Sequence, residues 1–69
     1  MMARELRFIG TTSDHDECPT LYELPSGDYA VQGDLLTDPE EIAQLRALGA
    51  AEGAVVVPRA LLVRFAPKG

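Results

Sequence analysis

The residues with the clearest chemical capacity lie between positions 14 and 18, where the sequence reads Asp-His-Asp-Glu-Cys. Imidazole nitrogen and thiolate sulfur are zinc ligands, but a structural zinc site takes four such groups with paired spacings. The chain has one histidine, His15, and one cysteine, Cys18. We therefore predict no metal site and no cofactor, and metal-assisted chemistry at His15 and Cys18 stays the third of three hypotheses for the function.

Cys18 is also the only candidate cysteine nucleophile. Such a residue needs a general base and a third group that orients the base. The neighbouring carboxylates oppose formation of the thiolate, which is the reactive species. Cys18 is better explained as a small apolar residue at the start of a strand, and we predict that the protein is not an enzyme and has no catalytic residues.

Two other pairs of residues resemble reactive pairs but have structural explanations. Glu40 and Glu41 are adjacent on a predicted helix, so their side chains point apart and cannot act as an acid/base pair. Tyr22 and Tyr29 are expected to face each other across a hairpin, where cross-strand packing accounts for them. The alternative for the tyrosines is an exposed aromatic contact with a partner.

The elements that position these residues are organised around a hairpin within residues 18–39. Alternation of apolar and polar residues predicts strands over residues 20–24 and 28–36. Between them, Pro25 presets one backbone angle and Gly27 supplies the positive φ that a tight reversal needs. Gly33 inside the second strand indicates a bulge or a close backbone approach.

A helix is predicted over residues 39–48. Asp38 is a candidate N-cap, Pro39 suits the first helical position, and Glu41 completes a capping box. Apolar residues then recur at helical spacing, and Gly49 is a plausible stop. The stripe consists of Ile42, Leu45 and Leu48, with Ala43 beside it.

The flanking segments are expected to cover the hairpin. Residues 4–9 alternate as a short strand, and residues 54–57 read as a strand buried on both faces. Residues 58–65 predict a poorly capped helix, with a strand over 61–65 as the alternative. The predicted fold class is α+β: a small three- to four-stranded, mostly antiparallel sheet, with the helix after the central hairpin and a short C-terminal helix on one face.

Length and composition bound the organisation of the chain. Sixty-nine residues make a single domain, residues 1–69, with residues 66–69 expected to be a frayed tail. One cysteine permits no internal disulfide, which favours a reducing, cytoplasmic location. We expect no signal peptide and no membrane span, because the apolar runs are too short.

Charge is distributed unevenly along the sequence. Residues 11–52 contain ten acidic residues and one basic residue, Arg46, within a chain of net charge −5. Such a surface repels nucleic-acid phosphates and attracts a basic partner; the alternative is that it only maintains solubility. We predict that the partner meets six carboxylates with no compensating base: Glu23, Asp28, Asp34, Asp38, Glu40 and Glu41.

The last third of the chain has an apolar excess. Residues 54–65 include nine apolar residues in twelve, more than a small two-layer domain is expected to hide. A surplus apolar face usually meets another chain, so we predict a homodimer or an obligate partner. The predicted self-association residues are Val55, Val57, Leu61, Leu62 and Phe65.

The order of these motifs resembles a family of small actinobacterial proteins of unknown function, encoded beside helix-turn-helix regulators of sporulation and antibiotic production. Five features of the sequence support this resemblance. They are the N-terminal segment Thr11-Thr12-Ser13, the predicted strand after Cys18, the predicted strand that begins at Gly27, the Asp38-Pro39 pair and the C-terminal segment from Val55 to Phe65. The chain departs from the family pattern at Gln32, where arginine is usual, and at Val57, where threonine is usual.

The resemblance implies a regulatory companion protein without catalytic residues. We therefore expect a non-enzymatic protein that binds a basic, DNA-binding partner through its acidic surface and does not contact nucleic acid directly. The alternative is a small structural or ligand-binding module that self-associates through the apolar C-terminal segment.

Overall fold

The computed structural model of the chain describes residues 3–12 and 19–66. It has the predicted α+β fold, with a three-stranded antiparallel sheet and two helices. The sequence did not predict the separate two-stranded sheet. The larger sheet has the order β1 (Arg7–Thr11), β2 (Thr20–Glu23), β3 (Tyr29–Gln32). The smaller sheet pairs β4 (Asp34–Leu35) with β5 (Val55–Val56), and the helices are α1 (Pro39–Ile42) and α2 (Arg59–Phe65). The expectation that both helices cover one sheet face is wrong, because among the described helices only α2 packs on the larger sheet.

The β2–β3 hairpin forms where the sequence predicts it. Its turn is closed by backbone hydrogen bonds from Gly27 N–H to the Leu24 carbonyl at 2.9 Å and from Leu24 N–H to the Asp28 carbonyl at 2.8 Å. Gly27 has a φ of 93°, a conformation that residues with a Cβ rarely adopt. The predicted Pro25-Ser26-Gly27 turn is therefore confirmed, including the positive φ at Gly27 where the chain reverses direction.

The pairing register separates the two tyrosines, so the prediction that they face each other is wrong. Tyr22 lies opposite Ala30, whereas Tyr29 lies opposite Glu23. Because directly opposed residues share a face and successive residues alternate, Tyr22 and Tyr29 point to opposite faces of the sheet. Tyr22 instead packs edge-on against Phe8, with ring centroids 6.3 Å apart, and donates a hydrogen bond from its hydroxyl to Gln32 Oε1 at 2.9 Å.

Gly33 divides the predicted strand over residues 28–36 into β3 and β4. A Cβ added at Gly33 would lie 2.7 Å from the Val56 carbonyl oxygen and 2.6 Å from Val57 Cγ1. The expected close backbone approach is thus confirmed, and it is made by the chain returning through β5. The crossing turns β4 out of the three-stranded sheet, which explains why the prediction of one continuous strand is wrong.

The core lies between α2 and the sheet. Leu61 is 0% exposed and Leu21 is 2% exposed. A Cβ at Gly10 would collide with the Phe65 ring, so the absence of a side chain there allows α2 to approach β1. The helix over 58–65 is confirmed, and the alternative strand over 61–65 is wrong. Its N-cap, Pro58, makes no side-chain capping bond, in agreement with the poor cap expected.

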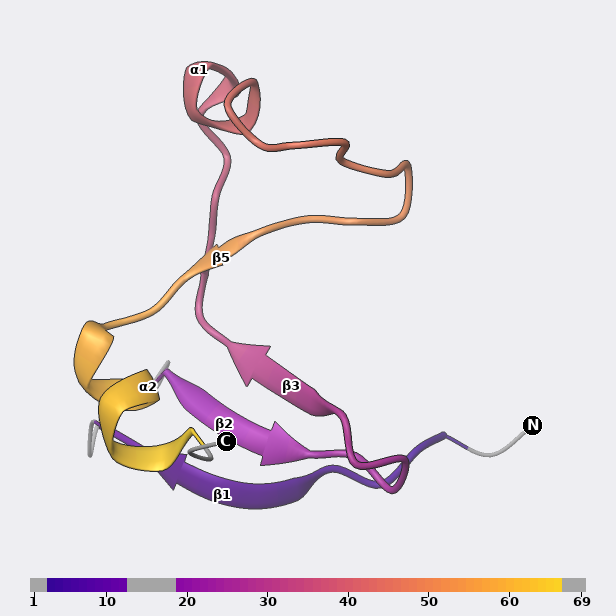
Figure 1. Ribbon diagram of the computed structural model, residues 1–69, viewed down its shortest axis with the longest axis vertical. Coiled ribbons are helices and arrows are strands. Elements are labelled where there is room, and N and C mark those ends of the chain that lie inside the picture. The colour runs from indigo at the N-terminus through magenta and orange to yellow at the C-terminus, as the bar shows by residue number, and fades with distance from the viewer. Residues whose placement is uncertain (1–2, 13–18, 67–69) are drawn as a thin grey trace.

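The helix predicted over residues 39–48 is a single turn. Asp38 caps it as expected, accepting a hydrogen bond at Oδ1 from the Glu40 N–H at 2.9 Å. The predicted length is wrong, because α1 ends at Ile42 and buries no residue. Figure 1 shows α1 standing away from the three-stranded sheet, so only α2 covers a sheet face. Isolated short helices are marginal in water, and in the stripe Ile42, Leu45, Leu48 no side chain is fully buried.

We call residues 34–56, which comprise β4, α1, the following loop and β5, the arm. Figure 1 shows the arm extending from the sheet. The expectation that residues 54–57 form a strand buried on both faces is wrong, because Val55 and Val56 are 38% and 57% exposed. At the other end of the chain, β1 begins at Arg7 instead of residue 4 and its register with β2 shifts between Phe8 and Gly10.

The position of Leu61 predicts a large loss of stability in the variant Leu61→Ala. Removing a fully buried leucine side chain costs about 2–5 kcal/mol, because apolar burial is lost and a cavity remains. Urea unfolding followed by circular dichroism measures this loss. The matched control is Val63→Ala in the same helix, where the side chain is 67% exposed and the expected change is within about 0.5 kcal/mol. Equal effects at both positions would contradict the packing described for α2.

Candidate partner-binding surfaces

The six carboxylates predicted to meet a partner fall into two groups. Glu23 and Asp28 lie at the β2–β3 turn, at the end of the sheet where β3 begins. The other four, Asp34, Asp38, Glu40 and Glu41, lie on the arm. Figure 1 shows the β2–β3 turn and α1 at opposite ends of the molecule. The structure therefore does not gather the six residues into one surface.

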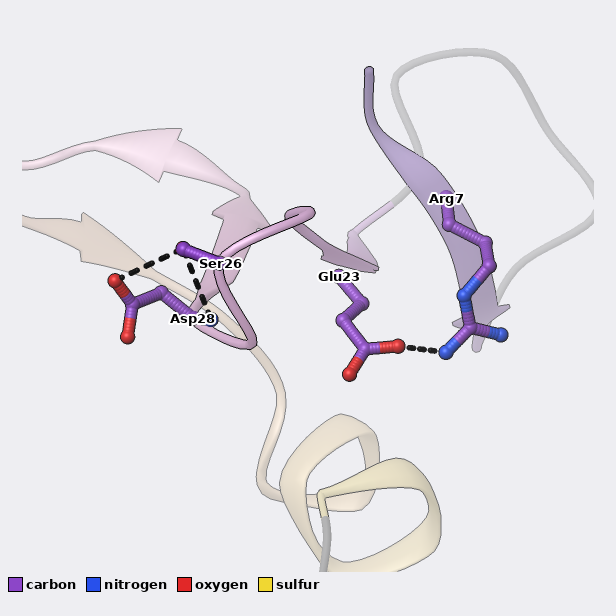
Figure 2. A network of polar contacts seen from close by, with 4 residues as sticks. All are labelled: Arg7, Glu23, Ser26 and Asp28. Carbon is purple, nitrogen blue, oxygen red and sulfur yellow. Dashed lines mark hydrogen bonds and ion pairs between the residues drawn. The ribbon is translucent and has the colours of Figure 1, made fainter. Parts of the chain in front are cut away.

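Glu23 has a compensating base, contrary to the prediction from the sequence. Arg7, opposite Glu23 in the β1–β2 register, forms an ion pair and hydrogen bond with it. Figure 2 shows the two side chains reaching toward each other from neighbouring strands. Asp28 instead accepts a hydrogen bond from the Ser26 hydroxyl at 3.2 Å. The turn group therefore retains one exposed carboxylate, Asp28, that forms no ion pair with any of the residues the structure describes.

A hollow of about 340 Å³ lies beside this ion pair, lined by Glu5, Arg7, Glu23, Leu24, Pro25 and Gly27. The predicted sites did not include Glu5 or Arg7. Their alternation with Leu6 and Phe8 places them on the same face, but only the β1–β2 register brings that face to Glu23. The Arg7 guanidinium is already paired with Glu23, so the lining offers no arrangement of acid, base and nucleophile.

The arm carries the denser group of unpaired charge. It contains five carboxylates and one guanidinium, Arg46, a net charge of −4. Asp34, Asp38, Glu40 and Glu41 are all exposed, and within residues 3–12 and 19–66 none of the four forms an ion pair. Asp38 and Glu40 still have local roles in α1, because Asp38 accepts the capping bond from the Glu40 N–H.

The predicted self-association residues divide between core and surface. Leu61 is fully buried, so its assignment to a surface is wrong. Phe65 is half-buried against Gly10, and its role in self-association stays a prediction. Val57 is half-buried beside Gly33. Val55 and Leu62 are exposed. Leu35 is 74% exposed but was not among the predicted surface residues, because its strand was expected to lie in the larger sheet.

The described residues show no metal centre and no membrane-spanning helix. No group of three or more His, Cys, Asp or Glu residues is arranged to hold a metal ion within residues 3–12 and 19–66. His15 and Cys18, the candidates from the sequence, lie outside these residues. Neither α1 nor α2, the helices in the described part of the chain, is long and apolar enough to cross a membrane.

Comparison of the chain with protein-family models, with curated proteins and with solved structures finds no match. The geometry of the chain itself is therefore the basis for the functional argument.

The Arg7–Glu23 pair predicts a small, salt-dependent contribution to stability. The Arg7 side chain is 69% exposed, so solvent screens the attraction, and we expect a coupling of roughly 0.2–1 kcal/mol. A double-mutant cycle with Arg7→Ala and Glu23→Ala, measured by urea unfolding, gives this coupling energy. We expect it to fall in high salt. A coupling of several kcal/mol that salt leaves unchanged would show that the pair is not a screened surface pair.

Proposed function

We propose that this chain is a non-enzymatic companion protein that binds a basic protein partner through the exposed carboxylates of the arm. The single observation that carries the proposal is the unpaired charge of the arm: Asp34, Asp38, Glu40 and Glu41 are exposed, and no ion pair forms at any of them within the described residues. Because the arm stands away from the sheet (Figure 1), a partner can reach these groups without displacing the core.

Electrostatic complementarity is the physical basis of this binding. An excess of one charge sign on a surface steers an oppositely charged partner to it and raises the association rate. The same charge repels phosphate groups, so the proposal excludes direct binding of nucleic acid by the arm. A basic surface on a DNA-binding protein has the complementary sign, and the carboxylates would compete with DNA phosphates for it.

The family resemblance supports a particular kind of partner. The small actinobacterial proteins that this sequence resembles are encoded beside helix-turn-helix regulators, so we propose such a regulator as the basic partner. The protein would then act in the cytoplasm, which a single cysteine in 69 residues also favours, because a small extracellular domain more often relies on disulfides.

The proposal is tested by charge reversal on the arm. The immobilised wild-type chain is expected to capture a DNA-binding protein from a lysate of its native cell, identified by mass spectrometry. The double variant Glu40→Lys, Glu41→Lys should lose this capture, because it replaces two attractive charges with two repulsive ones. Affinity of the purified pair should fall steeply with salt, as expected for contacts between exposed charges.

The matched control is Glu5→Lys, Asp28→Lys, which makes the same change in net charge at the β2–β3 turn end of the molecule. We expect this control to retain capture, with only the weaker long-range loss that the change in net charge causes. Equal loss in both double variants would show that net charge, and not the arm, attracts the partner. Capture that survives reversal on the arm and is insensitive to salt would overturn the proposal and leave solubility as the role of the carboxylates.

A further inference from the structure

Strand β3 forms an open edge of the larger sheet. In the order β1-β2-β3 it pairs with β2 alone, and β4, the next strand along the chain, pairs with β5 instead. Among the elements of residues 3–12 and 19–66, α2 packs on β1 and β2. Figure 1 shows no strand or helix of the described chain alongside β3 on the side away from β2.

The β2–β3 register decides which backbone groups face that edge. The hydrogen bond that the Asp28 carbonyl accepts across the turn makes this residue a hydrogen-bonded position of the ladder. Such positions alternate with non-hydrogen-bonded ones along an antiparallel pair of strands. Ala30 and Gln32 therefore bond to their partners on β2. The N–H and C=O groups of Tyr29 and Val31 point away from β2, toward the open edge.

This edge has little protection against pairing with another strand. Natural proteins block exposed edges with lysine, proline or a bulge, but β3 reads Tyr-Ala-Val-Gln and its register with β2 is continuous. Its length of four residues limits an added strand to a short segment. Tyr29 and Val31 are 41% and 38% exposed, so their side chains offer that segment apolar contact. A row of backbone donors and acceptors is matched by another extended polypeptide.

Charge selects the composition of that polypeptide. Asp28 comes immediately before β3, and Asp34 follows it after Gly33. Both carboxylates are exposed, and neither forms an ion pair with a residue that the structure describes. A segment with lysine or arginine near its ends complements both charges. A second copy of this chain is a poorer match, because each copy has a net charge of −5 and β3 has no basic residue.

We propose that β3 binds an extended, basic segment of a protein as the fourth strand of the larger sheet, antiparallel to β3. Two alternate residues of the segment exchange backbone hydrogen bonds with Tyr29 and Val31, as in an antiparallel hydrogen-bonded pair. Basic side chains near the ends of the segment meet Asp28 and Asp34. This site is separate from the carboxylates of α1, and its occupation does not require the partner proposed above.

An alternating lysine–valine heptapeptide with blocked ends is the probe, titrated into the full chain and followed by NMR. We expect the amide protons of Tyr29 and Val31 to shift and to gain protection from exchange. Those of Ala30 and Gln32, already bonded to β2, should change little. Methylation of the valine nitrogens, which face β3, should raise the Kd at least about 10-fold by removing hydrogen bonds. Methylation of the lysine nitrogens, which face solvent, is the matched control and should leave the Kd nearly unchanged.

Charge variants separate this site from the arm. Asp28→Asn should raise the Kd of the peptide about 2- to 5-fold, as for an exposed charge pair, whereas Glu41→Gln, the same loss of charge on α1, should not. Capture by the arm has the opposite dependence, so either proposal can fail alone. Absence of binding, equal binding of a glutamate–valine peptide, or equal effects of the two methylations would overturn the proposal. Protection of Tyr29 and Val31 in the free chain that is lost on dilution would overturn it too, because a second copy would then occupy the edge.

Discussion

The packing of Leu61 against the β1–β2 layer is the interaction on which the rest of the structure depends. Leu21 and Leu61 are the buried hydrophobic residues among those described. Gly10 allows α2 to lie close to β1, because any side chain there would meet the Phe65 ring. In a chain of 69 residues the conformational entropy lost on folding is nearly as large as the apolar burial gained. The packing of one helix, α2, therefore accounts for the core of the larger sheet. Little apolar surface remains against which the arm can pack.

The exposure of the arm follows from this shortage of apolar surface. Among the described elements α2 is the helix that packs on the larger sheet, whereas α1 buries no residue and stops after one turn. The arm exposes an apolar face at Leu35 and Val55 and a carboxylate at Asp34 on the other face. Because strand residues alternate between faces, the two features do not compete for space.

The candidate site was only partly predictable from the sequence. Counting charges identified the acidic residues of the arm, because charged side chains in a small domain are almost always exposed. The separation of Asp28 from Glu40 and Glu41 and the pairing of Glu23 with Arg7 could not be predicted in this way. Both depend on which strands pair and in what register. Likewise, Leu61 belongs to the apolar segment expected to self-associate, yet its position on α2 places it in the core.

The sequence alone determined the features that neighbouring residues can enforce: the turn at Gly27, the cap at Asp38 and the C-terminal helix that carries Leu61. Each follows from backbone sterics or a local hydrogen bond, which act over a few residues. Tertiary structure decided the length of α1, the opposite faces of Tyr22 and Tyr29, and the exposure of Val55. Those depend on contacts with distant segments, because helix length and strand burial are set by the surface available for packing.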